Sequence, residues 1–181
     1  MENIYDLWIG DRQISIPIAI ASMAGMVDGA YIRERADHIG IGFIGGYAID
    51  ERTIAAAREL SHQGREEFLP HNPIEEIAGQ VALVEDAGVI PGINIRASEV
   101  KSLVTLATAI GDHAIYEIDA HCRQQAMIDA GCGEYLLSHP DKLVTYVQAL
   151  KIIGVTVSVK IRAGVAQNDI NLVKLLWKAG A

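Results

Sequence analysis

The sequence predicts an α/β protein built on a parallel sheet, and three observations indicate this class. Short runs of β-branched residues alternate with amphipathic helical runs along the chain. The strand-like runs are continuously apolar, as expected for strands that helices cover. Of the 181 residues, half are hydrophobic and 17 are glycine, a composition typical of a compact α/β domain. Right-handed crossovers then place the carboxyl ends of all strands at one edge, where we expect the functional site.

Each expected element has a local reason. Helix starts are indicated by capping residues, and helix ends by glycines that can adopt a left-handed conformation. Five strands are expected, at Ile16–Met23, Ile41–Tyr47, Val89–Ile95, Ala114–Asp119 and Val155–Ile161. Helices are expected to start at Asp28, Asp50, Asn72-Pro73-Ile74-Glu75, Ser98 and Ser138-His139-Pro140-Asp141, and to stop at Gly88, Gly111 and Gly154. Core positions are expected at Ile18, Ile20, Ile44, Ile93, Ile118 and Val159.

The stretch Gly40-Ile41-Gly42-Phe43-Ile44-Gly45-Gly46 satisfies the G-x-G-x-x-G pattern of dinucleotide-binding proteins. That fingerprint must follow a strand and open a helix, whereas here a helical run at about 29–38 precedes it. We therefore interpret the stretch as a glycine-rich second strand, in which Gly45 and Gly46 allow a ligand or backbone to come close.

The charge and hydropathy of the chain argue against nucleic acid and membranes as its partners. The formal net charge of −8 disfavours nucleic acid, because phosphate contacts provide most of the affinity in such complexes. The longest apolar runs are too short and too rich in Gly and Ala to span a bilayer, and no signal peptide precedes them. We expect a cytoplasmic protein with no membrane partner, whose two cysteines are reduced.

Polar residues gather where the predicted strands end. A buried strand has no structural need for Lys160. Its charge either pairs with Glu117 or Asp119, or is held rigidly for an anionic ligand atom. The strand ends carry Ser22-Met23-Ala24-Gly25, Gly46-Tyr47, Asn94, Glu117–Cys122 and Lys160-Ile161-Arg162.

Two architectures fit this pattern: a doubly wound open sheet, which the length favours, and a (β/α)8 barrel of which about five units are present. The chain resembles the tRNA-dihydrouridine synthases at Ala21–Asp28, Asn94, Glu117–Cys122, Gly131–Leu137 and Val159–Gly164. This resemblance implies a TIM-type parallel (β/α) barrel, incomplete here, with the first five βα units in a single domain over residues 1–181. It also implies an FMN-dependent oxidoreductase that reduces or oxidises a pyrimidine-like ring.

The resemblance also implies roles for individual residues. Met23 would lie against the flavin ring, and Asn94 takes the place of a glutamine that usually hydrogen-bonds this ring. Lys160 would face the N1/O2 edge of the flavin, where positive charge stabilises the reduced anion. The implied cofactor-binding residues are Ser22, Met23, Ala24, Asn94, Lys160 and Arg162.

Cys122 matches the family's cysteine, a general acid that protonates the uracil ring. Around it the family usually reads Asn-x-Gly-Cys-Pro, whereas this chain has Asp119-Ala120-His121-Cys122-Arg123. We therefore expect Asp119, His121 and Arg123 to contact a different substrate, and His121 or Arg123 to increase the thiolate character of Cys122. Cys132, in a Gly-Cys-Gly turn, is expected to be a packed small side chain.

Two other classes of function stay open. The family's glycine-rich phosphate-binding loops have no counterpart here, so one alternative is a flavin-free barrel that acts as a binding or assembly protein. The other is a thiol-based or metal-assisted enzyme using Asp119, His121 and Cys122, although no C-x-x-C or H-x-x-x-H pair supports zinc. tRNA as a partner follows from the resemblance alone, and the unpaired edges of an incomplete barrel predict self-association. The charged stretch 61–72 is either a lid over the site or an ordinary surface loop.

Overall fold

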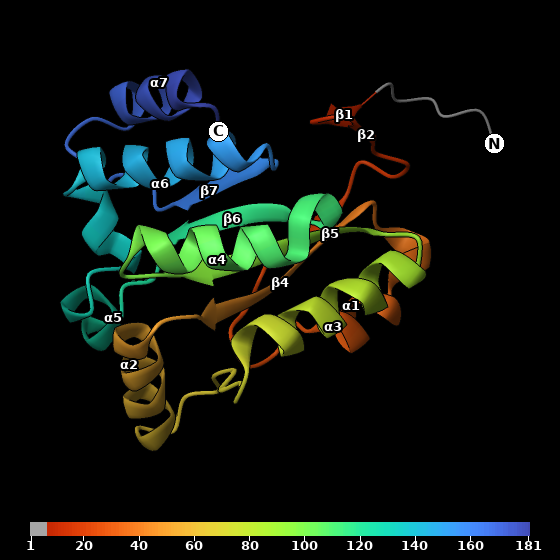
Figure 1. The fold of residues 1–181 in the computed structure, drawn as a ribbon, viewed down its shortest axis with the longest axis horizontal. Coiled ribbons are helices and arrows are strands. Elements are labelled where there is room, and N and C mark those ends of the chain that lie inside the picture. The colour runs from red at the N-terminus through yellow and green to blue at the C-terminus, as the bar shows by residue number, and fades with distance from the viewer. Residues whose placement is uncertain (1–6) are drawn as a thin grey trace.

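Five parallel strands form the sheet on which the chain is built, as seen in a computed structural model that describes residues 7–181. Neighbours in the sheet are also neighbours in sequence, and the sheet curls into a half-barrel like part of a TIM barrel (Figure 1). The strands in spatial order are β3 (Ala19–Ile20), β4 (Ile41–Ala48), β5 (Ile90–Arg96), β6 (Ile115–Ala120) and β7 (Val157–Ile161). The fold class predicted through the family resemblance is thus confirmed, and residues 41–46 of the glycine-rich stretch lie in strand β4.

Helices lie on the outside of the sheet and at one of its ends. The crossovers are α1 (Gly29–Arg33) with η1 (Ala36–His38), α3 (Pro73–Asp86), α4 (Val100–Ile110) with η2 (Gly111–His113), and α6 (Pro140–Ile153), and α7 (Asp169–Ala179) follows β7. Three further helices follow the carboxyl ends of β4 and β6, namely α2 (Glu51–His62), α5 (Gln125–Asp129) and η3 (Gly133–Leu137). The α2 and α5 helices pack against each other at the end toward which the arrow of β4 points (Figure 1).

Most predicted helix boundaries are confirmed. Asp28, Asp50 and Asn72 each accept a hydrogen bond from a backbone N–H in the first turn of the helix that follows. The helix predicted to start at Ser98 instead has Glu99 as its cap, because the Ser98 hydroxyl donates to Asp50 Oδ1 at 2.9 Å. Positive φ angles are found at the three predicted helix stops, Gly88, Gly111 and Gly154.

The amino-terminal part differs most from expectation. The first strand was predicted over Ile16–Met23, but β3 has only two residues, and it pairs with β4 at the edge of the sheet. A hairpin of β1 (Trp8–Ile9) and β2 (Arg12–Gln13), which the sequence did not suggest, precedes it. Ile18, predicted to be buried, has 55% of its surface exposed. An edge strand lacks a neighbour on one side, so its apolar pattern does not guarantee burial.

The core lies between the sheet and the crossover helices. Ile44, Ile93 and Ile118 are at most 1% exposed, as predicted, and Ile20 and Val159 are partly buried against the same cluster. The alternate positions along the central strands face the other side of the sheet and carry polar residues, because side chains alternate between the two faces of a strand. Polar residues on this second face line the candidate site described below. Within residues 7–181, every helix is too short or too polar to cross a lipid bilayer.

Candidate functional site at the carboxyl edge of the sheet

Polar side chains from three neighbouring strands meet because the strands are parallel and in register. Asn94 of β5 lies opposite Glu117 of β6, and Asp119 of β6 lies opposite Lys160 of β7. Asn94 Nδ2 donates a hydrogen bond to Glu117 Oε1 at 2.8 Å. Gly46 of β4 lets the Asn94 side chain lie close against its backbone, since a Cβ there would lie 2.6 Å from Asn94 Oδ1. At Gly45 an added Cβ would lie 2.6 Å from the backbone oxygen of Asn94, so the expected close approach of backbone at this pair of glycines is confirmed.

These strand ends line a pocket of about 380 Å³. Such a volume falls in the range of small-molecule sites. The pocket brings together all ten site residues suggested by the sequence, namely Ser22, Met23, Ala24, Asn94, Asp119, His121, Cys122, Arg123, Lys160 and Arg162. It also contains five lining residues outside that set, namely Met26, Gly46, Arg65, Arg96 and Gln124.

Asp119 organises the turn that carries the cysteine. Its Oδ1 accepts hydrogen bonds from the backbone N–H groups of His121 and Cys122, both at 2.9 Å. Its Oδ2 lies 3.2 Å from Arg96 Nε. The carboxylate is 5% exposed and already engaged by three protein donors, so its main effect is to hold Cys122 in position.

Cys122 carries a protonated thiol at neutral pH. Burial raises its pKa above the ordinary value, and the nearby Arg96 guanidinium opposes this only in part. His121 adds no positive charge at neutral pH, because burial and then Arg162 lower its pKa. The raised pKa of Cys122 is opposite in direction to the gain in thiolate character that was expected from His121 or Arg123.

Cys132 is a packed side chain, as predicted. It is fully buried, and its Sγ donates to the backbone oxygen of Met127 at 3.2 Å. Both cysteines are free thiols in this structure. No group of three or more His, Cys, Asp or Glu side chains that could hold a metal ion is present in the described part of the chain.

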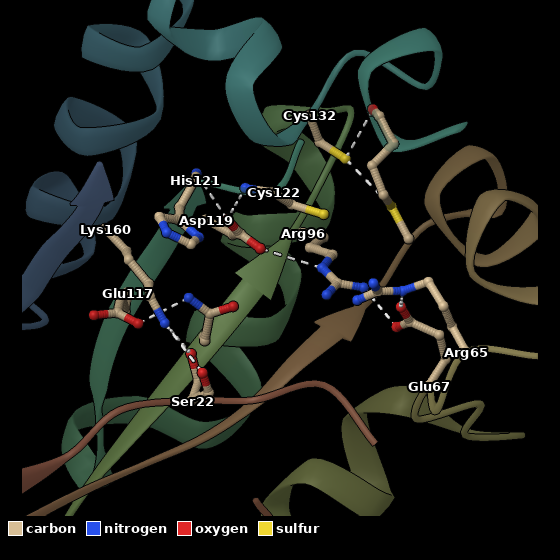
Figure 2. Close-up of polar contacts among 12 residues, drawn as sticks. Ser22, Arg65, Glu67, Arg96, Glu117, Asp119, His121, Cys122, Cys132 and Lys160 are labelled. Atoms are coloured by element: carbon tan, nitrogen blue, oxygen red, sulfur yellow. Dashed lines mark hydrogen bonds and ion pairs between the residues drawn. The ribbon is translucent and has the colours of Figure 1, made fainter. Parts of the chain in front are cut away.

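Lys160 is held by a neutral partner. Its Nζ donates to the backbone oxygen of Ser22 at 3.1 Å and to Ser22 Oγ at 3.0 Å (Figure 2). Among the described residues it forms no ion pair within 4 Å, although its charge lowers the pKa of Glu117 somewhat against the larger raising effect of burial. The alternative of a structural pair with Glu117 or Asp119 is therefore not the observed arrangement. Arg162, in contrast, pairs with Glu134 at 2.5 Å.

Arg96 and Glu67 form the part of the site that the sequence did not reveal. Arg96 lies between Asp119 and Glu67, with Nη1 2.6 Å from Glu67 Oε2 (Figure 2). The position two residues after Asn94, on the same face of β5, is a signal that could have identified Arg96. Glu67 belongs to a segment between two helices and has no comparable signal.

The segment between α2 and α3, residues 63–72, packs down onto the site. The Glu67 side chain is fully buried, and the rings of Phe68 and Tyr47 lie 4.9 Å apart. A Cβ at Gly25 would lie 2.4 Å from the backbone of Glu66, so the segment also contacts the loop after β3 closely. From the stretch suggested as a lid, Arg65 lines the pocket and Glu67 contacts Arg96, so this segment forms part of the wall of the site.

Comparisons with known proteins add one relative. Models of known protein families show no match to this chain. The chain is similar to a protein of Methanocaldococcus jannaschii named uncharacterized protein MJ0144, with 29% identity over 150 residues. The aligned part covers 80% of this chain and 57% of that protein, so the chain spans somewhat more than half the length of this relative.

Proposed function

We propose that the chain is a flavin-dependent oxidoreductase of the dihydrouridine synthase type, which reduces or oxidises a pyrimidine-like ring with Cys122 as the acid. The observation that carries this proposal is a protonated thiol on the wall of a pocket that Asn94, Lys160 and Met23 also line. Each of these residues comes from the end of a different strand or strand-following loop. TIM-barrel enzymes place catalytic residues at the same edge.

The residues present fit the ring portion of FMN. Met23 is 47% exposed and offers an apolar surface toward the pocket, while Asn94 supplies an amide and Lys160 a cation. Gly46 lines the same pocket and presents backbone without a side chain beside Asn94. When bound, FMN would supply hydride chemistry that no amino-acid side chain can provide.

The protein's own contribution is proton supply and charge placement. Hydrogenation of a ring double bond adds a hydride at one carbon and a proton at the other. Cys122 holds this proton on Sγ, and Asp119 keeps the thiol in place through the two backbone N–H groups of the turn. Lys160 places a fixed positive charge where negative charge develops. A small ring suits this acidic chain better than tRNA, which the resemblance alone suggests.

The test is an absorption spectrum of the purified protein, repeated after addition of FMN and gel filtration. We expect flavin absorbance to be retained, and Lys160→Met to weaken FMN binding about tenfold because a charge-assisted contact is lost. Lys174→Met, on the exposed face of α7, is the matched control and should bind FMN normally. Cys122→Ala should keep the flavin and lose turnover. If the unmodified protein retains no flavin, the proposal fails, and the flavin-free alternative replaces it.

A further inference from the structure

Positive charge concentrates in the pocket of an otherwise acidic protein. The chain has 15 Lys and Arg residues against 23 Asp and Glu residues. Five of the basic side chains line the pocket, namely Arg65, Arg96, Arg123, Lys160 and Arg162, whereas Asp119 is the acidic residue among the lining residues. A random share of the charges would give the pocket more acids than bases. This local excess favours a ligand that carries negative charge.

Part of this charge is already compensated within the protein. Arg96 is paired with Glu67 and Asp119, and Arg162 with Glu134. Lys160, as described above, is bound to a neutral serine and belongs to the proposed flavin side of the site.

Arg65 and Arg123, at the exposed rim of the pocket, are the pocket arginines whose charge is least compensated by acidic neighbours. Arg65 lies 3.5 Å from Glu67 Oε1, but Glu67 makes its shorter contact, 2.6 Å, with Arg96. The Arg65 side chain is 43% exposed. Arg123, directly after Cys122, is exposed and forms no ion pair with any residue in the range 7–181. Guanidinium groups bind carboxylates and phosphates through paired N–H donors, and both of these exposed arginines line the same pocket.

We propose that Arg65 and Arg123 form an anion-binding subsite at the rim of the pocket, for a carboxylate or phosphate carried by a small ligand. The inference deepens the proposed function and rests on it for the identity of the ligand as a ring compound. The anionic group belongs either to the substrate, as a ring carboxylate or nucleotide phosphate, or to the cofactor, as the phosphate of FMN. Arg123 stands where the dihydrouridine synthases usually have proline, so the subsite is a feature of this chain.

The test compares two rings that differ by one negative charge. Uracil is neutral and its 6-carboxylate, orotate, is an anion. Binding of each is measured by calorimetry with the flavin-free protein and with Arg65→Gln, Arg123→Gln and the matched control Arg58→Gln, an exposed arginine of α2 outside the pocket. The same variants are titrated with FMN and with inorganic phosphate. Circular dichroism checks that the variants fold.

We expect orotate to bind more tightly than uracil and to lose about tenfold in affinity in each rim variant, with uracil and Arg58→Gln unaffected. That result assigns the anion to the substrate. A loss of FMN and phosphate affinity in the rim variants, with orotate unchanged, supports the same subsite and assigns the anion to the cofactor. The proposal is overturned if the affinities for orotate, FMN and phosphate are all unchanged in Arg65→Gln and Arg123→Gln. It is also overturned if Arg58→Gln lowers these affinities as much as the rim variants do. Arginine-dependent orotate binding by a protein that retains no flavin would refute the proposed function alone.

Discussion

Arg96 of β5 and Glu67 of the segment 63–72 form an ion pair of 2.6 Å in which the two side chains are 5% and 0% exposed. Asp119, which holds the cysteine turn, contacts the same guanidinium. The pair therefore connects the wall of the site to the turn that carries Cys122. A shift of the segment 63–72 would be transmitted to the cysteine turn through three contacts, from Glu67 to Arg96, from Arg96 to Asp119, and from Asp119 to the backbone N–H of Cys122.

Arg96→Met tests this connection. Removal of the guanidinium leaves Glu67 and Asp119 as buried charges without their partner, and we expect a loss of about 3 kcal/mol in the free energy of unfolding. Urea denaturation measures this loss. Arg58→Met, which removes an exposed arginine of α2, should change stability by less than about 0.5 kcal/mol. Equal stability of the two variants would contradict a structural role for the buried pair.

The protonation state of Cys122 predicts its reactivity. Because its pKa is raised, the thiolate fraction is small at neutral pH, and alkylation by iodoacetamide should be slow there and accelerate only in the alkaline range. Cys132→Ser leaves Cys122 as the single thiol of the described chain and is the background for the measurement. Rapid alkylation with a plateau below pH 7 would show a thiolate, and would favour a nucleophilic role over the acid role.

Because the carboxyl group of Glu117 is buried, we expect the stability of the protein to depend on pH. Burial raises its pKa above the model-compound value of 4.5, partly offset by the hydrogen bond from Asn94 and the charge of Lys160. The folded state thus binds the proton more tightly than the unfolded state does, so stability falls as the pH rises above about 4.5 toward the folded-state pKa. Glu117→Gln keeps an acceptor for Asn94 and cannot ionise.

Denaturation midpoints at several pH values measure this effect. We expect Glu117→Gln to be more stable than the unmodified protein at pH 7, with the advantage shrinking as the pH is lowered to 4. Glu59→Gln, an exposed residue of α2, controls for the change in net charge. An advantage that is the same at every pH would rule out ionisation of Glu117 as the cause.

Gly46→Ala should displace the Asn94 side chain. The added Cβ would lie 2.6 Å from Asn94 Oδ1 and 3.0 Å from Arg96 Nε, so we expect a destabilisation of about 1–3 kcal/mol and weaker ligand binding. Gly79→Ala is the matched control, because an added Cβ on α3 meets no atom within 4 Å. This control should gain about 0.5–1 kcal/mol from helix propensity. If Gly46→Ala were as stable as the control, the contact would not be tight.

Exposed apolar residues near strand β7, at one edge of the sheet, lead us to expect that the protein associates with a second copy of itself. On α7, Ile170, Val173 and Trp177 are 68%, 51% and 78% exposed and recur at helical spacing. Beside them an apolar groove of about 540 Å³ runs between the amino-terminal hairpin, β7 and α7. We expect light scattering to show a dimer that Trp177→Lys dissociates, whereas Leu69→Lys, an exposed apolar residue on the segment 63–72, leaves it intact. A monomer at all concentrations would refute the expectation.

The sequence by itself indicated the alternation of sheet strands and crossover helices, their caps at Asp28, Asp50 and Asn72, and the gathering of polar residues where the strands end, whereas the family resemblance selected the ten site residues that meet in the pocket. The sequence could do so because side-chain alternation and capping are local, and because parallel strands bring their carboxyl ends to one edge whatever the details of packing. The choice of a barrel over an open sheet depended on the family resemblance, since both architectures share these local patterns.

Only the tertiary structure decided which groups contact one another and which are shielded from water. Ile18 has the same apolar pattern as Ile44, but it lies at an edge strand and is exposed. The pairing of Arg96 with Glu67 joins residues 29 positions apart, and the thiol of Cys122 stays protonated because its surroundings exclude water. Burial, and the electrostatics that follow from it, depend on which elements cover a residue, and no local sequence pattern contains that information.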